Sequence, residues 1–178
     1  MVAEYYMNRF ESLGFGMFVH FGLYSKLGRG EWAASGEEFL PRSEYNAISK
    51  TFRIKEGFFK DLVGVARTAG CRYIILTTRH HDGFSLYDTK GLSDFDIMHT
   101  PTARDLVGEF VTECRAADIL PIFYHTGLDW TRREYAEDFP AYLEYLRQSI
   151  ALLCTNYGEI GGFWFDGFWD KRDWELDR

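Results

Sequence analysis

Four short apolar runs recur along the chain, and each ends in polar, ionisable side chains. They occupy residues 18–20, 74–81, 122–125 and 160–166, and they end in His20, His80 with His81, His125 and Asp166. Runs of this length, rich in β-branched and aromatic residues and followed by turn residues, are typical of buried strands. We therefore predict strands over about 14–21, 72–78, 120–124 and 160–165.

Segments with helical spacing of apolar residues separate the later strands. Residues 56–69 are expected to form a helix that ends before Gly70, and the segment after Thr102 resembles a capping box that opens a helix to about residue 117. Pro140 fits the N1 position of a third helix, which reaches residue 156. The inward face of that helix is predicted to carry four residues: Leu143, Leu146, Ile150 and Leu153. Residues 22–55 are predicted to be irregular.

This order alternates strand and helix, which predicts a parallel α/β sheet with right-handed crossovers. The loops after the strands are long, and in such folds the functional residues lie on that side. A closed (β/α)8 barrel typically needs about 250 residues. The chain has 178 residues, so we predict one unit, residues 1–178, that holds about the first four βα units of a TIM-type barrel.

Composition narrows the class of partner. The net charge is −7, and no cluster of Lys or Arg is present, which argues against nucleic acid or an anionic membrane as partner. The first twenty residues show no signal-peptide pattern, and no apolar run is long enough to span a membrane. A cytoplasmic protein is the resulting expectation.

The three cysteines lack metal-ligand spacing. Cys114 and Cys154 fall in predicted helices and Cys71 just before a strand. We expect all three to be small buried thiols.

The strand-end residues are the candidate chemistry. Asp166 could act as a nucleophile, as a general base, or only as a cap on the turn at Gly167. His80 and His81 would face opposite ways within a strand, but at a strand end both could reach one ligand. The alternative is one core histidine and one surface histidine.

Aromatic side chains make up 18% of the sequence, and many lie beside these polar strand ends. Core packing explains most aromatics, yet this placement favours a ligand such as a sugar, whose apolar faces stack on rings. Glu31 and Trp32 offer a carboxylate beside an indole. The strand-end histidines could also bind zinc or iron, although no His-x-His pair is present, and His99 is expected in a surface loop.

Together these motifs resemble the α-L-fucosidases of glycoside hydrolase family 29. The resemblance covers most of the chain and rests on six segments: FGMFVHFGLYS at 15–25, EW at 31–32, YIILTTRHHDGF at 73–84, TPTARDLV at 100–107, FY at 123–124 with GLDW at 127–130, and WFDG at 164–167.

The resemblance implies a retaining hydrolase that removes α-linked L-fucose from an oligosaccharide or glycoconjugate, with no cofactor and no metal. It makes Asp166 the nucleophile. It also implies a sugar-binding set of seven residues: His20, Glu31, Trp32, His80, His81, Tyr124 and Trp164.

The chain departs from the family pattern at four places. Phe21 replaces a Trp, Ala33 replaces an aromatic residue, and His125 stands where a small Ser is common. The acid/base of the family lies well downstream of the nucleophile, and none of the carboxylates that remain after Asp166 matches it: Asp170, Asp173 and Glu175.

Three functional alternatives follow. The chain could belong to an active fucosidase, could be a catalytically incomplete fucose-binding fragment without the acid/base, or could belong to a metal-dependent barrel hydrolase. A four-stranded half-barrel also leaves two open edges, near Phe18 and Trp164. We therefore expect self-association, pairing with a missing C-terminal half, or an open, marginally stable sheet.

Overall fold

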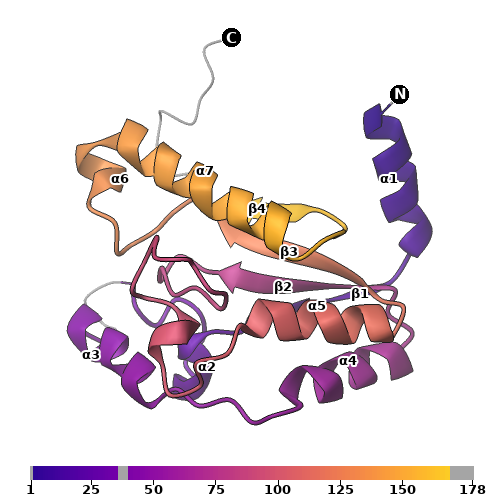
Figure 1. The fold of residues 1–178 in the computed structure, drawn as a ribbon, viewed down its shortest axis with the longest axis horizontal. Helices are drawn as coiled ribbons and strands as arrows, with labels where there is room; N and C mark the ends of the chain where they lie inside the picture. The colour runs from indigo at the N-terminus through magenta and orange to yellow at the C-terminus, as the bar shows by residue number, and fades with distance from the viewer. Residues whose placement is uncertain (1, 36–39, 169–178) are drawn as a thin grey trace.

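The computed structural model describes residues 2–35 and 40–168 (Figure 1). In chain order the elements are α1 Val2–Leu13, β1 Gly16–Val19, α2 Leu23–Leu27, α3 Arg42–Ala47, the 3₁₀ helix η1 Ile48–Thr51, α4 Phe58–Thr68, β2 Tyr73–Arg79, the 3₁₀ helix η2 Ile97–His99, α5 Leu106–Ala116, β3 Leu120–Thr126, α6 Glu134–Glu137, α7 Phe139–Asn156 and β4 Phe163–Asp166.

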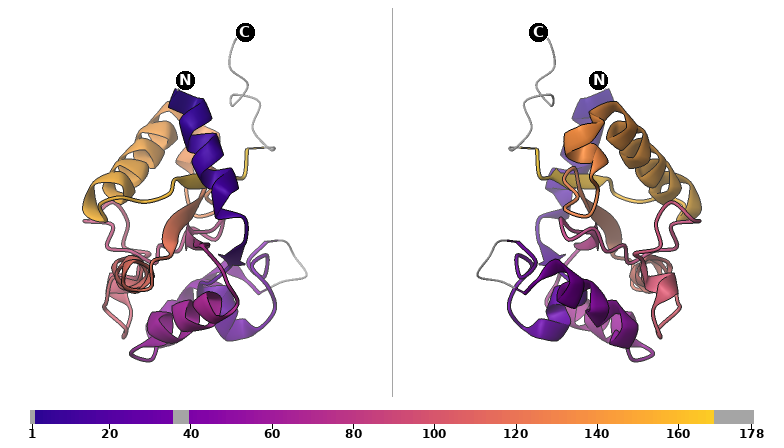
Figure 2. Two further views of the ribbon diagram at one scale, coloured as in Figure 1. Left: turned by 90° about the vertical axis from the view of Figure 1, so that its right-hand side faces the viewer. Right: turned by 90° about the vertical axis from the view of Figure 1, so that its left-hand side faces the viewer.

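The four strands form one parallel sheet in the order β1-β2-β3-β4, as predicted. The helices α4, α5 and α7 lie along one side of this sheet (Figures 1 and 2). Because each crossover carries a helix back to the start of the next strand, all four strands point the same way. The polar residues at their carboxyl ends therefore gather at a single edge.

The main core lies between the sheet and these helices. Alternate residues of β2 and β3 face it, and they meet the apolar faces of the three helices in one buried cluster that includes Ile74, Leu76, Phe123, Phe59, Phe110 and Leu153. The other face of the sheet carries only a small cluster of Ile75, Ile122 and Tyr124. That second face is incompletely covered, since Phe18 is 40% exposed and Trp164 is 53% exposed.

The edges of the sheet are β1 and β4, where the sequence places them. Phe18 lies on β1, and Trp164 and Phe165 lie on β4. Each edge strand has a neighbour on one side only within the described residues. Their outward backbone groups are available for pairing with another chain.

The prediction that residues 22–55 are irregular is wrong in part, because α2, α3 and η1 lie there. These helices are short and gain their stability from tertiary contacts more than from their own sequence. Tyr24 of α2 lies 3.3 Å from the Thr77 hydroxyl, and the Tyr45 hydroxyl of α3 donates to the Asp82 carboxylate. Both tyrosines are buried. The local pattern of apolar and polar residues does not predict these long-range contacts.

The predicted capping box at Thr102 is also wrong. The N-cap of α5 is Asp105, whose carboxylate accepts a hydrogen bond from the Gly108 amide. Ala103 has a φ of 44°, which a helix cannot contain. The Thr102 hydroxyl instead donates to the Phe52 carbonyl and holds a distant loop.

The predicted inward face of α7 is confirmed in part, because Leu146 and Leu153 are buried and Ile150 is partly buried. Its N-cap is Asp138, so that Pro140 occupies the second helical position. Leu143 is 39% exposed, because the buried stripe instead runs along Phe139, Tyr142, Leu146, Ser149 and Leu153. This stripe includes tyrosine and serine side chains that bond buried partners, which a purely apolar pattern does not detect.

Two of the three cysteines are buried as expected, and one is not. Cys71 and Cys114 are buried, whereas Cys154 is exposed on the outer side of α7. Cys154 directly follows the buried Leu153 in the helix, and one position along a helix rotates a side chain by about 100°. Within the described part of the chain, no helix has the length and apolar character needed to cross a membrane.

Candidate active site

The carboxyl ends of the strands bring most of the predicted residues together. His20 follows β1, and His80 and His81 follow β2. In the β3–β4 register, Tyr124 stands opposite Trp164 and Thr126 opposite Asp166. The parallel sheet thus places imidazoles, a phenol and a carboxylate at one edge.

Asp166 is held by two hydrogen bonds, one to each carboxylate oxygen. The Tyr124 hydroxyl donates to Oδ2 at 2.8 Å, and the Gly167 amide donates to Oδ1 at 2.8 Å. His81 Nε2 lies 3.7 Å from Oδ2. Burial raises the pKa of Tyr124, which therefore remains a donor at neutral pH. Asp166 caps its turn and also presents an oriented carboxylate to the site.

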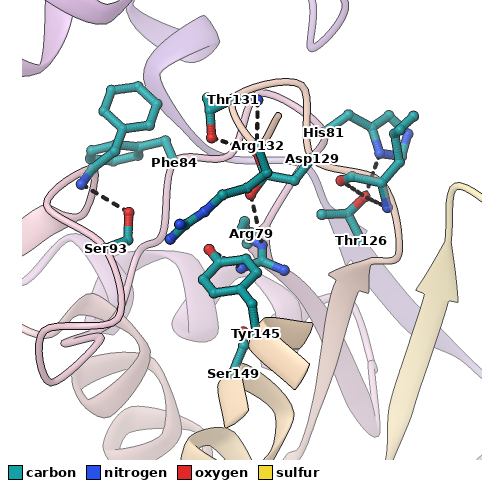
Figure 3. A network of polar contacts seen from close by, with 12 residues as sticks. Arg79, His81, Phe84, Ser93, Thr126, Asp129, Thr131, Arg132, Tyr145 and Ser149 are labelled. Atoms are coloured by element: carbon teal, nitrogen blue, oxygen red, sulfur yellow. Dashed lines mark hydrogen bonds and ion pairs between the residues drawn. The ribbon is translucent and has the colours of Figure 1, made fainter. Parts of the chain in front are cut away.

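Both strand-end histidines are buried, so the alternative of one core and one surface histidine is wrong. His80 is 3% exposed and His81 is 1% exposed, and their rings lie 4.2 Å apart. The His81 Nδ1 atom lies 2.6 Å from the Thr126 hydroxyl (Figure 3). The other ring nitrogen, Nε2, lies on the side of Asp166. The His80 ring stacks on Tyr124 at 5.5 Å.

His20 and Glu31 border the same group. The His20 ring lies 5.4 Å from that of His80 and 5.3 Å from that of Tyr124. Burial lowers the pKa of His20, while the negative charges of Glu31 and Asp166 oppose that shift. Those charges therefore face His20, and the site contains both hydrogen-bond donors and acceptors.

Aromatic rings flank the polar group. The Trp32 and Trp130 rings lie 5.3 Å apart, and each lies 5.5 Å from His81. Trp164 packs against Phe18 at 5.4 Å and is half exposed. Trp130 is missing from the set implied by the family resemblance, although its place in the GLDW segment just after β3 could have identified it.

His125 lies outside the site, contrary to its place in the strand-end pattern. Its ring is buried between β3 and α7, where Nδ1 lies 3.0 Å from the Thr78 hydroxyl and Nε2 lies 3.0 Å from the Ser149 hydroxyl. Side chains alternate along a strand, so its neighbours Tyr124 and Thr126 face the site instead.

No three His, Cys, Asp or Glu side chains among residues 2–35 and 40–168 are grouped as metal ligands. His99 is exposed, as expected, and its Nδ1 lies 2.7 Å from an Asp96 carboxylate oxygen. Asp170, Asp173 and Glu175 lie outside the described residues.

Several groups in and behind the site have shifted pKa values. Burial, together with the charges of His81 and His20, lowers the pKa of His80 to about 2. Burial and the nearby Arg79 cation hold the pKa of His125 well below its usual value. Burial raises the pKa of Asp82 to about 6, although Tyr45 donates to this carboxylate. His80 and His125 are therefore neutral in the folded protein at neutral pH.

These shifts predict that the free energy of unfolding falls when the pH drops from 7.5 to 5.5. In the unfolded chain a histidine gains a proton below about pH 6.5, while buried His80 and His125 stay neutral in the folded state. Each of these two histidines therefore lowers the free energy of unfolding by roughly 1.4 kcal/mol between pH 7.5 and pH 5.5. Asp82 opposes this, because the folded state takes up its proton first, and it offsets less than about 1 kcal/mol. Urea unfolding at both pH values measures the difference.

The control for this prediction is His125→Gln, which can still bond the Thr78 and Ser149 hydroxyls without titrating. Its pH-dependent loss should be smaller by about 1.4 kcal/mol, the share of one histidine. An unchanged loss would mean that His125 is not kept neutral by the fold.

A protein-family model described as α-L-fucosidase matches residues 1–178. The chain belongs to the α-L-fucosidase family. A solved α-L-fucosidase isoenzyme 1 from Paenibacillus thiaminolyticus is 34% identical with a TM-score of 0.85, and the match covers 93% of this chain and 44% of that one. The tissue α-L-fucosidase of Macaca fascicularis is 27% identical over 182 residues, covering 93% of this chain and 39% of that protein.

A third α-L-fucosidase is a GH29 protein of Bacteroides thetaiotaomicron, whose structure is a trapped covalent intermediate with 2-fluoro-fucosyl fluoride. It is 26% identical with a TM-score of 0.74, and the match covers 87% of this chain and 39% of that one. The chain thus spans about two fifths of the length of these α-L-fucosidases. Its four-stranded parallel sheet corresponds to the N-terminal part of their (β/α)8 barrel.

Proposed function

We propose that this chain forms the fucose-binding and nucleophile-bearing part of a retaining α-L-fucosidase, with Asp166 as the nucleophile. The observation that carries the proposal is the Asp166 carboxylate at the end of β4, oriented by Tyr124 and Gly167 and facing His81. The family of the chain and the covalent intermediate trapped in the Bacteroides relative support it.

The proposed reaction has two displacements. An Asp166 oxygen attacks the anomeric carbon while the bond to the leaving oxygen breaks, and a general acid gives that oxygen its proton. Water then attacks the fucosyl ester, loses a proton to the same group, and frees the Asp166 carboxylate. In a retaining site the general acid/base is a second carboxyl group, which lies about 5–5.5 Å from the nucleophile. We assign it to no residue of the described chain.

The remaining residues suit recognition of a neutral sugar. Imidazoles of His20, His80 and His81 and the Glu31 carboxylate offer hydrogen bonds to ring hydroxyls. Trp32 and Trp164 offer apolar surfaces for the sugar edge and its methyl group. Trp130 extends the surface of Trp32. The substrate that fits these groups is an oligosaccharide or glycoconjugate ending in α-linked L-fucose.

Covalent labelling tests the nucleophile directly. Fluoride leaves without a proton, so 2-fluoro-fucosyl fluoride should label Asp166 even where no general acid is present. Mass spectrometry of the digested chain should place one fluorofucosyl group on the peptide that carries Asp166, and Asp166→Asn should stay unlabelled. Labelling at another residue, or none at saturating reagent, would overturn the assignment.

The two buried histidines should contribute to sugar affinity. We predict that His80→Ala and His81→Ala each weaken binding of 1-deoxyfuconojirimycin, a fucose-mimicking iminosugar, by several-fold or more, because a lost hydrogen bond is worth roughly 0.5–1.5 kcal/mol. Calorimetric titration measures the affinity. His99→Ala is the matched control, since His99 is exposed and outside the site, and its affinity should equal that of the parent chain.

Equal affinity in both site variants would remove these histidines from the binding set. The same titration after exhaustive chelation addresses a metal-dependent hydrolase. We expect unchanged affinity. A loss of affinity that is reversed by adding zinc or iron would favour the metal-dependent hydrolase.

The incomplete fucose-binding fragment remains the second candidate. The observation in its favour is that the described residues provide the sugar-binding groups and Asp166 while the sheet keeps two open edges. Binding of the iminosugar without turnover of any fucoside, in every polypeptide that contains this chain, would support it over the hydrolase.

A further inference from the structure

Arg79 at the end of β2 is a fully buried cation. Its side chain is 1% exposed, and Nη1 donates to the Tyr145 hydroxyl at 2.5 Å. Nε lies 4.0 Å from the Oδ2 atom of Asp129, which is also buried (Figure 3). Within the described residues, Nε, Nη2 and that carboxylate oxygen have no hydrogen-bond partner. An arginine stays charged in proteins, so a cation lies buried beside the Asp129 carboxyl group.

Burying such a pair is costly and seldom stabilises a fold. Desolvation offsets much of the attraction, and apolar residues of similar size often serve stability as well or better. The Arg79–Asp129 pair is nevertheless surrounded by further specific contacts. The Tyr145 ring contacts two guanidinium groups, with Arg79 Cζ at 4.8 Å and Arg132 Cζ at 3.8 Å from its centroid. Arg132 in turn donates to the Leu92 carbonyl at 2.7 Å.

The Asp129 end of the pair is interlocked with the turn that follows His81. Its Oδ1 atom accepts hydrogen bonds from the Thr131 amide and hydroxyl. The same oxygen lies 2.5 Å from where a Cβ on Gly83 would stand, and Gly83 has a φ of 82°. Only glycine allows this approach of the β2 turn to the β3 loop.

The interlock reaches the site through one further bond. The Trp130 amide donates to the His81 carbonyl at 2.9 Å, and the two rings lie 5.5 Å apart. Trp130 directly follows Asp129, and His81 comes two residues after Arg79. The two charged residues therefore stand at the base of the two segments that carry this histidine and this indole.

We propose that Arg79 and Asp129 are positioning residues, whose buried pair with Tyr145 holds His81 and Trp130 in register with Asp166. This inference rests on the proposed function. In that function, the pair fixes the distance between the His81 imidazole and the Asp166 carboxylate, so that both reach one sugar. Neither residue touches the substrate.

Single and double replacements separate positioning from stability. Arg79→Met or Asp129→Asn alone leaves one buried group without its partner and should lower the free energy of unfolding strongly. The double variant removes both charges and should recover much of that loss. If the pair positions the site, affinity for 1-deoxyfuconojirimycin should stay at least tenfold weaker in the double variant, although its stability has returned.

A second comparison uses tyrosine hydroxyls. Tyr145→Phe removes the acceptor of Arg79 and should weaken iminosugar binding several-fold. Tyr157→Phe is the matched control, because Tyr157 donates to the Asp105 carboxylate at 2.6 Å, at the start of α5 and away from the site. It should lower stability by a similar amount and leave affinity unchanged.

Nuclear magnetic resonance provides a readout that needs no ligand. In the double variant, the imidazole signals of His81 and the indole NH signal of Trp130 should shift, whereas the signals of His99 should stay as they were. If the parent chain binds no iminosugar, the proposed function fails, but these shifts still test the positioning role. A refolded double variant with parent-like affinity, or with unchanged His81 and Trp130 signals, would overturn the inference.

Discussion

Replacing Asp166 with alanine is expected to abolish fucoside cleavage in any polypeptide that contains this chain and turns over a fucoside. The rate of 4-nitrophenyl α-L-fucoside hydrolysis should drop by several orders of magnitude, because the covalent route disappears with the nucleophile. The fold should survive, since Asp166 is partly exposed and ends an edge strand. Steady-state assays and circular dichroism measure the two properties.

Azide and a matched variant complete this experiment. Azide is small enough to replace the missing carboxylate and should partly restore release of nitrophenol. Asp61→Ala is the control, since Asp61 is an exposed residue of α4 that pairs with Lys55, and it should retain the full rate. Near-normal turnover of the alanine variant without azide would contradict the role of Asp166.

The isolated 178-residue chain is expected to associate and to show no fucosidase turnover. The strands β1 and β4 are unpaired on one side within the described part, and Phe18, Trp164 and Phe165 are 40%, 53% and 45% exposed there. Unpaired parallel edges beside apolar surface pair readily with another copy or with further βα units. Sedimentation velocity measures association, and a fucoside with an alkyl leaving group, which needs a general acid, measures turnover.

Edge variants make this expectation specific. Trp164→Lys places a charge on an exposed edge position and should shift the chain toward monomer, whereas Val65→Lys on α4, also exposed, should not. A stable monomer that hydrolyses the alkyl fucoside would contradict the prediction. It would also require Asp170, Asp173 or Glu175 to act as the acid/base.

The sequence predicts well the four strands and the polar residues at their carboxyl ends, because each strand has a local apolar pattern that ends at a turn. The run before Asp166 and the segment before His80 are apolar, short and followed by glycine turns, and the parallel order follows from the helices between them. His20, His80, His81, Tyr124 and Asp166 therefore come together as expected. Their roles in catalysis and binding stay predictions until tested.

The failures share one physical cause, which is that long-range contacts decide them. Tyr45 makes α3 stable by bonding Asp82, a residue far along the chain. Thr102 bonds the distant Phe52 carbonyl, and α5 begins only after its N-cap, Asp105. Ser149 is inward-facing on α7 because His125 and Tyr87 bond it. A local hydrophobic pattern predicts none of these long-range contacts.

Every strand pair in the described sheet joins segments that are distant in the chain. Gly16 pairs with Tyr73, and Tyr73 pairs with Leu120, with no hairpin between them. Closing such loops costs chain entropy before the sheet contacts form, which slows folding relative to a helical bundle of equal length. On the ribosome, β1 emerges long before its partner strand. Until β2 is made, β1 and its apolar Phe18 have no partner strand, and an unpaired apolar strand is prone to pair with another chain.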